Sequence, residues 1–493
     1  MHLSGNSKSA GAGLTAMALL LAQGCTVGPH YQPPALPNIA AYAPLPAANA
    51  TASAPGPGGN AQRFDISDGI PAQWWTEFHS TALDSMVQQA LSNSPLLAEA
   101  TAKLRQAQEE LNARTGATRY PTVGGNTSVV QQQINLAAYG IPIANPSPFT
   151  LLNGSVAVSY ALDIFGGNRR LIEGLRAQTA YQQWQLEGAR LMLAGNVVSA
   201  AIRQAQLNSQ IEITRRMLDV EQQELKIVEA RRRAGGASDY EVSSQLTAVA
   251  QARALLPPLD QQLDAVNDQL AVLMGKSPAE VEAVRVPLDS LNLPEKLPIS
   301  VPSSLVRQRP DIRAAEALLH QASANVGVAT ANLYPQIVLT GGGGGVGKSF
   351  LSGGDIWNVG ASLAQPIYNG GALRAEQRKA QASYDEAGAV YRQTVLEAFE
   401  QVADVLYAIQ NDAQALQART EAATAADSAF EIASARYRAG GVSQISLLDA
   451  ERQQLQTKLD RTASDAGRYS DSATLFEALG GGWWSAKTDA STH

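Results

Sequence analysis

The stretch from Gly342 to Ser349 carries the letters of a phosphate-binding loop. It fits the pattern G-x-x-x-x-G-K-[ST], with Lys348 and Ser349 in the last two places. Such a loop binds phosphate only when a helix follows directly and presents its N-terminal amides. Here residues 350–355 are followed by an alternating, strand-like segment. The stretch is therefore predicted to be a glycine-rich hairpin loop without a nucleotide site.

No other set of residues has the types and spacing of a catalytic or metal centre. The histidines show no metal-ligand spacing, and no Ser/His/Asp or Cys/His arrangement stands out. The net charge of −7 argues against a general nucleic-acid partner. We therefore expect a protein that is not an enzyme and needs no cofactor or metal. The five histidines are His2, His30, His79, His320 and His493.

The single cysteine, Cys25, directly follows a segment typical of an export signal. The apolar core at 14–22 is too short to span a membrane as a helix. The sequence Ala22-Gln23-Gly24-Cys25 resembles a bacterial lipoprotein box, with Ala22 where Leu is usual. We expect cleavage before Cys25 and lipid on its thiol. Ordinary signal cleavage that leaves a free thiol is the alternative.

The second half of the chain repeats landmarks of the first. Tyr120-Pro121 recurs as Tyr334-Pro335, and residues 232–236 recur as 437–441, at offsets of about 203 to 215 residues along the chain. This spacing is too long for a solenoid repeat and indicates a duplicated structural half. The predicted division is a signal peptide over 1–24, a lipidated extended segment over 25–80 with no core of its own, a first repeat over 81–290, a second over 303–480 and a tail over 481–493.

Each repeat is predicted to contain the same four parts in the same order. A helix pair broken by Pro95 or Pro310 comes first. A β-hairpin follows, at about 121–164 and about 335–367. A long helix without proline comes next, and a returning helix follows a Gly-Gly turn. The long helices cover about 168–233 and 372–438, and the returning helices about 239–274 and 443–479.

The hairpin strands have a period of two and a length of about ten residues, which suits a tilted strand that crosses a bilayer. Val156, Val158 and Tyr160, for example, alternate with small residues. Aromatic residues mark the ends of the hairpins, as is typical of a membrane–water boundary, although they could also cap a soluble core. These residues are Tyr120, Phe165, Tyr334 and Tyr368.

The long helices carry a seven-residue apolar pattern that predicts paired, supercoiled helices. The pattern is strict in the second long helix and weaker in the first, where Ile211, Leu218 and Leu225 carry it. In the second helix, Val395, Val402, Ile409 and Leu416 form one line, and Phe399, Leu406 and Ala413 form the other.

Two hairpins supply four strands, which are too few to close a barrel, and open strand edges are not tolerated in lipid. Several copies must therefore share one barrel, with 8 strands for two chains or 12 for three as the nearest choices. The helices would continue this barrel as a tube. The expected object is a mainly α-helical duct with a transmembrane β-barrel.

Six motifs are informative together: Cys25–Pro33, Arg309–Arg313, Tyr334-Pro335, Gln365–Gly371, Leu447–Ala450 and Ala478–Trp483. By these motifs the chain resembles the TolC/OprM-type outer-membrane factor family, in the lipoprotein branch of tripartite efflux systems (NodT-like). The match spreads over nearly the whole chain in the family's order. The resemblance implies a homotrimer with a 12-stranded β-barrel in outer-membrane lipid and a helical barrel across the periplasm. It also implies two partners, a periplasmic adaptor and an inner-membrane proton-driven transporter of the resistance-nodulation-division type.

Carried over by this resemblance, Ile445 and Asp449 occupy the positions of the apolar and acidic constriction rings at the periplasmic gate. Symmetry would bring one Asp449 from each copy near the axis, and such a carboxylate ring attracts cations. A solvated helix residue is the simpler reading of Asp449. Tyr437, Arg438, Arg232 and Arg233 are expected at the same tip, where the arginines link neighbouring helices, meet an adaptor or are merely solvated.

The expected function is passive conduction of drugs or other small molecules to the cell exterior. A duct for type I protein secretion is the alternative. A soluble coiled-coil scaffold would explain the helices but gives no reason for two alternating hairpins.

Overall fold

The computed structural model describes residues 26–37, 39, 41–42, 50–66, 69–135, 140, 147–280, 285–348 and 354–484. The expected signal peptide, Cys25 and most of the tail lie outside these residues. The chain folds into two compact units. One is built from the described residues within 1–34, 103–183 and 314–392, and the other from those within 35–102, 184–313 and 393–493.

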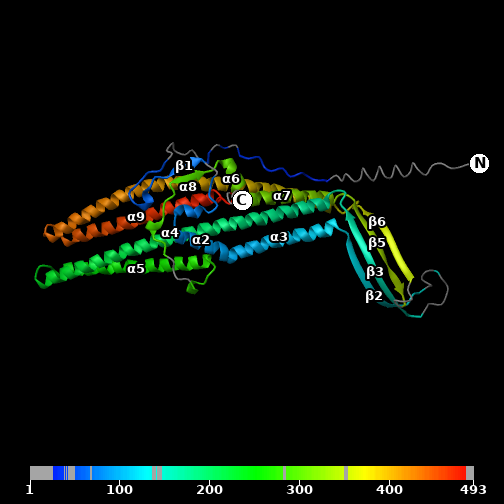
Figure 1. Cartoon of the computed structure of the whole chain (residues 1–493), viewed down its shortest axis with the longest axis horizontal. Coiled ribbons are helices and arrows are strands. Elements are labelled where there is room, and N and C mark those ends of the chain that lie inside the picture. The colour runs from blue at the N-terminus through cyan, green and yellow to red at the C-terminus, as the bar shows by residue number, and fades with distance from the viewer. Residues whose placement is uncertain are drawn as a thin grey trace, which may run out of the picture. The chain divides into compact units, whose positions relative to one another are not determined.

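The first unit contains a four-stranded antiparallel sheet with the order β2-β3-β5-β6 (Figure 1). β2 (Thr122–Gln132) pairs with β3 (Phe149–Leu162), and β5 (Gln336–Gly347) pairs with β6 (Gly354–Ala364). The two hairpins join through β3 and β5, so that β2 and β6 remain at the open edges. The duplication is thus visible as two equivalent hairpins in one sheet.

The register gives the sheet one apolar and one polar face, as the alternation predicts. Val123 lies opposite Val158, which lies opposite Gly341, which lies opposite Val359. On the other face Thr122 lies opposite Ser159, which lies opposite Thr340. Trp357 and Val359 on the apolar face are 80% and 82% exposed, so this single chain leaves its apolar face uncovered.

The glycines of the apparent phosphate loop lie in strand β5, so the expectation of a hairpin loop there is wrong. Gly342 and Gly344 pair with Ala157 and Ser155 of β3. A Cβ atom on Gly344 would lie 2.2 Å from the carbonyl oxygen of Gly154. Close strand approach therefore explains the glycine at that position.

Helices run from both ends of the hairpins, and the two long helices, like α3 and α7, contribute to both units. α3 (Pro95–Arg119) precedes β2 and α4 (Gly167–Arg233) follows β3. α7 (Pro310–Ala331) precedes β5 and α8 (Ala372–Arg438) follows β6. In α3 Leu97 is the one buried residue, so nearly all of this helix surface is open in the single chain.

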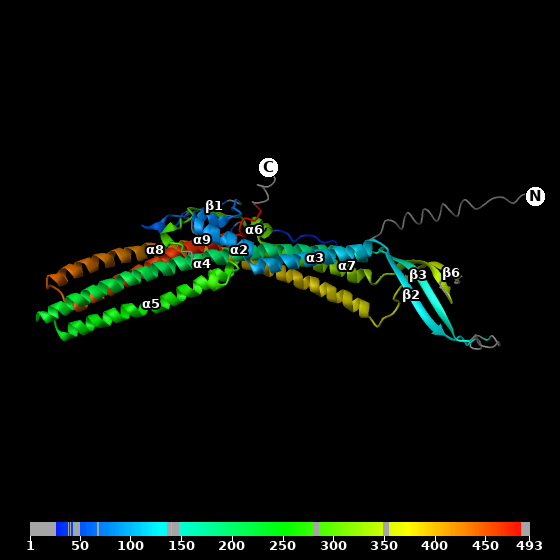
Figure 2. The same ribbon diagram turned by 60° about the horizontal axis from the view of Figure 1, so that its bottom comes forward.

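In the second unit the returning helices complete two hairpins, as Figures 1 and 2 show from two sides. α5 (Asp239–Leu273) lies beside α4, and α9 (Gln444–Ala478) lies beside α8. The seven-residue pattern of the second long helix is confirmed, because all of its members are buried. They are Val395, Phe399, Val402, Leu406, Ile409, Ala413 and Leu416.

Several described residues between 50 and 78 are buried against other elements of the second unit, so this part of the expected extended segment adds to a core that those elements share. β1 (Arg63–Ile66) pairs in parallel with β4 (Lys296–Ile299). Gln62 is fully buried and donates to Ser472 at 2.8 Å. The short 3-10 helix η2 (Trp74–Phe78) buries Trp74, Trp75 and Phe78.

The remaining short elements are α2 (Thr81–Asn93) and α6 (Pro302–Gln308), with 3-10 turns at Pro57–Gly59, Pro278–Glu280 and Leu288–Ser290. Along the described ranges, none of the helices combines the length and the apolar character that a membrane crossing requires.

Candidate functional site

The first candidate site is the turn between the long and the returning helix, which has the same geometry in both repeats. Gly235 and Gly440 have φ angles of +77° and +75°. The next residue in each case donates its backbone N–H back to the helix, from Gly236 to Arg231 at 2.7 Å and from Gly441 to Arg436 at 2.8 Å. This is a Schellman ending, which requires a left-handed residue and favours glycine.

Serine then starts each returning helix. Ser238 accepts from the backbone N–H of Glu241, and the Glu241 side chain accepts from the N–H of Ser238 in return. Ser443 accepts from the N–H of Ser446. These caps fix the direction of the first turns of α5 and α9.

Ile445 and Asp449 lie in the first two turns of α9, four residues apart and therefore on one side of the helix. Ile445 is 50% exposed, and the Asp449 side chain is also mostly exposed. Arg452 donates to the Asp449 carboxylate at 3.0 Å. The sequence reasoning missed this intrahelical ion pair, although the i,i+3 spacing is a signal that could have found it.

The tip arginines have different surroundings. Arg232 forms an ion pair with Asp239 across the turn, and Arg438 donates to Ser434 at 2.8 Å. Arg233 is exposed. Tyr437 is buried, and the guanidinium of Arg231 lies 5.2 Å from the centre of its ring. A contact between Arg231 of α4 and Tyr437 of α8 thus joins the two helix hairpins.

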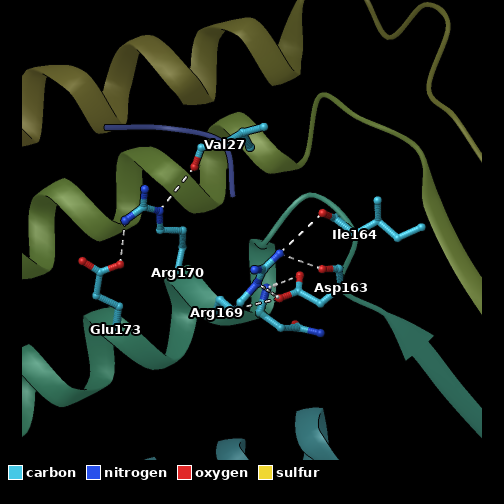
Figure 3. Close-up of polar contacts among 7 residues, drawn as sticks. Val27, Asp163, Ile164, Arg169, Arg170 and Glu173 are labelled. Carbon is cyan, nitrogen blue, oxygen red and sulfur yellow. Dashed lines mark hydrogen bonds and ion pairs between the residues drawn. The ribbon is translucent and has the colours of Figure 1, made fainter. Parts of the chain in front are cut away.

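The second candidate site is the corner where β3 meets α4, in the sheet-containing unit. The Asp163 carboxylate accepts the backbone N–H groups of Asn168 and Arg169, each at 2.9 Å. Figure 3 shows Arg169 folded back onto Asp163 and the carbonyl of Ile164. A carboxylate at the beginning of a helix is favoured by the helix dipole, so this corner is firmly held.

The chain directly after Cys25 is bound at this corner. Val27 donates its N–H to the carbonyl of Phe165 at 3.1 Å. Buried Arg170 donates to the carbonyls of Val27 and Gly28, both at 3.3 Å, as Figure 3 shows for Val27. A Cβ atom on Gly28, whose φ angle is +88°, would lie 2.5 Å from the Cα of Gly327. Only glycine fits this close crossing.

Charged and aromatic side chains extend the same contact. Glu173 accepts from Arg170 at 2.7 Å, and Nε2 of His320 lies 3.0 Å from the other Glu173 oxygen. Partial burial pushes the pKa of Glu173 upward, but its hydrogen bonds to Arg170 and His320 prevail and lower it. The ring of Tyr31 stacks on His320 with centroids 4.2 Å apart. The motif Cys25–Pro33 is visible in the sequence alone, but these partners, which are distant in the chain, are not.

The four aromatic residues that were predicted to mark a membrane boundary lie in the unit that contains the sheet, in two different settings. Phe165 and Tyr334 stack with their ring centroids 4.8 Å apart. Tyr120 is 62% exposed with Arg119 over its ring, and Tyr368 is 90% exposed. None of the described residues forms a cluster of three or more acidic, histidine or cysteine side chains suited to a metal ion.

Comparison with known proteins identifies the class. The profile of the family described as "Outer membrane efflux protein" matches residues 86–276 and 301–481, the two halves of the duplication. The chain belongs to this family of outer-membrane proteins, and its location is the bacterial outer membrane.

The relatives are similar over nearly their full lengths. The chain is 32% identical to the pyoverdine export outer membrane protein OpmQ of Pseudomonas aeruginosa, over 86% of this chain and 90% of that protein. It is 27% identical to the cation efflux system protein CusC of Escherichia coli O157:H7, over 93% and 96%. The solved outer-membrane channel OprN superposes with a TM-score of 0.83 at 29% identity, covering 93% of this chain and all of that one.

Proposed function

We propose that three copies of this chain form the exit duct of a tripartite efflux pump, which passively conducts small molecules across the outer membrane. The observation that carries the proposal is the sheet with two unpaired edges, β2 and β6, and an apolar face. In hydrocarbon the backbone of each open edge must be hydrogen-bonded to another strand. In an assembly of identical copies, β6 of one copy can pair with β2 of the neighbouring copy. Three copies with four strands each give the 12-stranded barrel of the resemblance.

The pairing between copies can be tested by cysteine cross-linking. A cysteine at Ser128 on β2 is combined with cysteines placed one at a time along β6, and the purified protein is oxidised. We expect covalent trimers for at least one position on β6. As a matched control, a cysteine at Ser155 on β3 is combined with the same series. β3 is flanked by β2 and β5 of its own chain, so its cysteine should give no cross-links between copies. Equal cross-linking from Ser155, or a purely monomeric product, would contradict the shared barrel.

The proposed gate is the tip of the helices, with Ile445 and Asp449 at the narrowest level. Both side chains are exposed in the single chain, as residues that face a pore must be. Threefold symmetry would turn Ile445 into an apolar ring and Asp449 into an acidic ring one turn further along α9. The ion pair of Arg232 with Asp239 and the contact of Arg231 with Tyr437 hold the surrounding turns.

The proposed partners are a periplasmic adaptor, which would meet the helical tip, and an inner-membrane transporter of the resistance-nodulation-division type. The names of the relatives support a pump, since they include a toluene efflux pump outer membrane protein of Pseudomonas putida as well as the pyoverdine and cation exporters. These names also favour small molecules over the alternative cargo, a secreted protein.

We also propose that Cys25 carries lipid. Residues 26–31 are held at the β3–α4 corner by Arg170 and by the Gly28–Gly327 crossing. Phe165 and Tyr334 of the proposed membrane boundary lie at the same corner. A lipid on the residue before Thr26 would thus start close to the membrane surface, and mass spectrometry of the mature protein tests this.

A further inference from the structure

Two glutamates are buried close to the tip in the second unit, and neither is neutralised by a base. Glu451 of α9 is fully buried, and within the described part of the chain neither of its carboxyl oxygens has a hydrogen-bond partner. Glu221 of α4 is 5% exposed. The charged groups that act on Glu451 are Glu221 and Glu224, which are both acids. An uncompensated buried carboxylate is costly, so this arrangement requires a physical explanation.

Two glutamines connect the same helices through a continuous hydrogen-bond chain. Gln444 of α9 donates from Nε2 to Oε1 of Gln245 at 3.0 Å. Gln245 of α5 donates to the carboxylate of Glu221 at 2.5 Å and to its backbone carbonyl at 3.2 Å. Both amides are buried. The chain therefore runs from the α8/α9 hairpin to the α4/α5 hairpin, beside the two acids.

The surroundings favour the protonated form of both carboxyls. Burial raises the pKa of Glu451 to about 8, and the negative charges of Glu221 and Glu224 add to this effect. Burial also raises the pKa of Glu221 to about 7, helped by Glu224 and opposed by the hydrogen bond from Gln245. At neutral pH the pair thus holds at least part of a proton, which removes the repulsion between its members.

The charged groups on the packed elements do not change this picture. From α4 the facing groups are Glu221 and Glu224, and from α5 the facing group is the neutral amide of Gln245. From α8 the nearby titratable group is Tyr437, which interacts with Glu224 of α4 and Glu241 of α5. Its ring takes the guanidinium of Arg231. Arg231 is not among the groups that shift either carboxyl.

We propose that Glu221 and Glu451 form a proton-binding site that holds the two helix hairpins together at the tip, and that loss of the proton separates them. The site rests on the proposed function, because it assigns a control to the proposed gate. Glu451 follows Asp449 by two residues on α9, so a movement of α9 away from α4 also moves the gate segment. Protonation stabilises the closed tip, and deprotonation leaves two like charges in a buried place.

Single-channel recording in planar bilayers tests the proposal with the full-length protein between pH 6 and pH 9. For the native chain we expect the open fraction to rise with pH, by up to about tenfold per pH unit for each proton released. Glu451→Gln keeps the size and the neutral form of the side chain, so its open fraction should stay low and depend on pH much less than in the native chain, through Glu221 alone. Asp460→Asn removes an exposed acid from the same helix and should behave like the native chain.

Thermal unfolding gives a second readout that does not depend on conduction. The native state binds protons that the unfolded chain has already released above its ordinary glutamate pKa of 4.5. Stability should therefore fall as pH rises from about 4.5 to about 8. This fall should be smaller in Glu451→Gln and in Glu221→Gln, which serves as the second variant if the first does not fold.

The possible failures can be told apart. If no variant and no native sample conducts at any pH, the proposed duct is wrong. The second failure is that the native chain and Glu451→Gln both conduct, with the same pH dependence of the open fraction and of the unfolding temperature. In that case the proposed duct stands and the proposed proton site is wrong.

Discussion

Asp449 is the residue on which the selectivity of the proposed gate depends. Its carboxylate is exposed and is partly neutralised by Arg452 at 3.0 Å. Exposed pairs of this kind contribute little to stability, about 0–1 kcal/mol. A substitution here should therefore change ion passage and leave folding nearly unaffected.

We predict that Asp449→Ala lowers the preference of the channel for cations, because each copy loses one negative charge and leaves Arg452 unpaired. Reversal potentials in a salt gradient measure this preference. The matched variant Arg452→Gln should shift the reversal potential in the opposite direction, because it frees the carboxylate. If both variants have the same reversal potential as the native chain, Asp449 does not face the pore.

At the residue scale, the sequence alone indicated candidate functional residues but not the residues that they contact. Ile445 and Asp449 could be named from their motif, and their shared helix side follows from a spacing of four. Arg170 and Glu451 could not be found, because their roles depend on Gly28 and Glu221, which are more than a hundred positions away in the chain. In a helical sequence that is rich in exposed acidic residues, a buried acidic residue cannot be distinguished from the others.

At the scale of elements, the two helix turns show how backbone geometry constrains sequence. Gly440 has a left-handed φ of +75°, and an added Cβ atom would meet nothing within 4 Å. The glycine is thus required by the backbone conformation and not by crowding.

We predict that Gly440→Ala destabilises the α8–α9 turn by about 1–2 kcal/mol, the cost of a left-handed non-glycine residue. The measurement is hydrogen exchange of the first turns of α9 in the full-length protein. Gly441→Ala is the control, because its φ is not left-handed and its Cβ atom would lie 3.5 Å from the carbonyl of Arg436. Equal exchange in both variants would mean that the turn relaxes without strain.

Most elements were predictable because their periodicity is strong. The alternation in β3 and the seven-residue lines of α8 are both present in the structure, with the apolar positions on one sheet face or in the helix contact. The pairing of β1 with β4 was missed, since four-residue strands carry too little pattern. The glycines of β5 were misplaced into a loop, because close packing against β3 and turn formation call for the same residue.

At the scale of the whole molecule, the two faces of the sheet require side chains of opposite polarity. Val359 and Asn358 are neighbours on β6, and their side chains project to opposite faces. In the proposed barrel the first meets lipid and the second meets water in the lumen.

We predict that Val359→Lys impairs insertion into the outer membrane, at a cost of about 2–4 kcal/mol per copy if the position lies near the bilayer centre. Asn358→Lys introduces the same charge on the polar face and should be tolerated. Membrane fractionation and trimer yield compare the two. If both variants insert equally well, the assignment of the faces is wrong.

The open strands β2 and β6 also have a consequence for biogenesis. A newly exported subunit has two unpaired strand edges and an exposed apolar face. It is therefore prone to incorrect strand pairing and aggregation until it assembles with other subunits. A factor that shields these surfaces during transit should therefore raise the yield of assembled protein. When the expression level is lowered, the amount of assembled trimer should fall more steeply than the amount of synthesised chain, because assembly requires three subunits to meet.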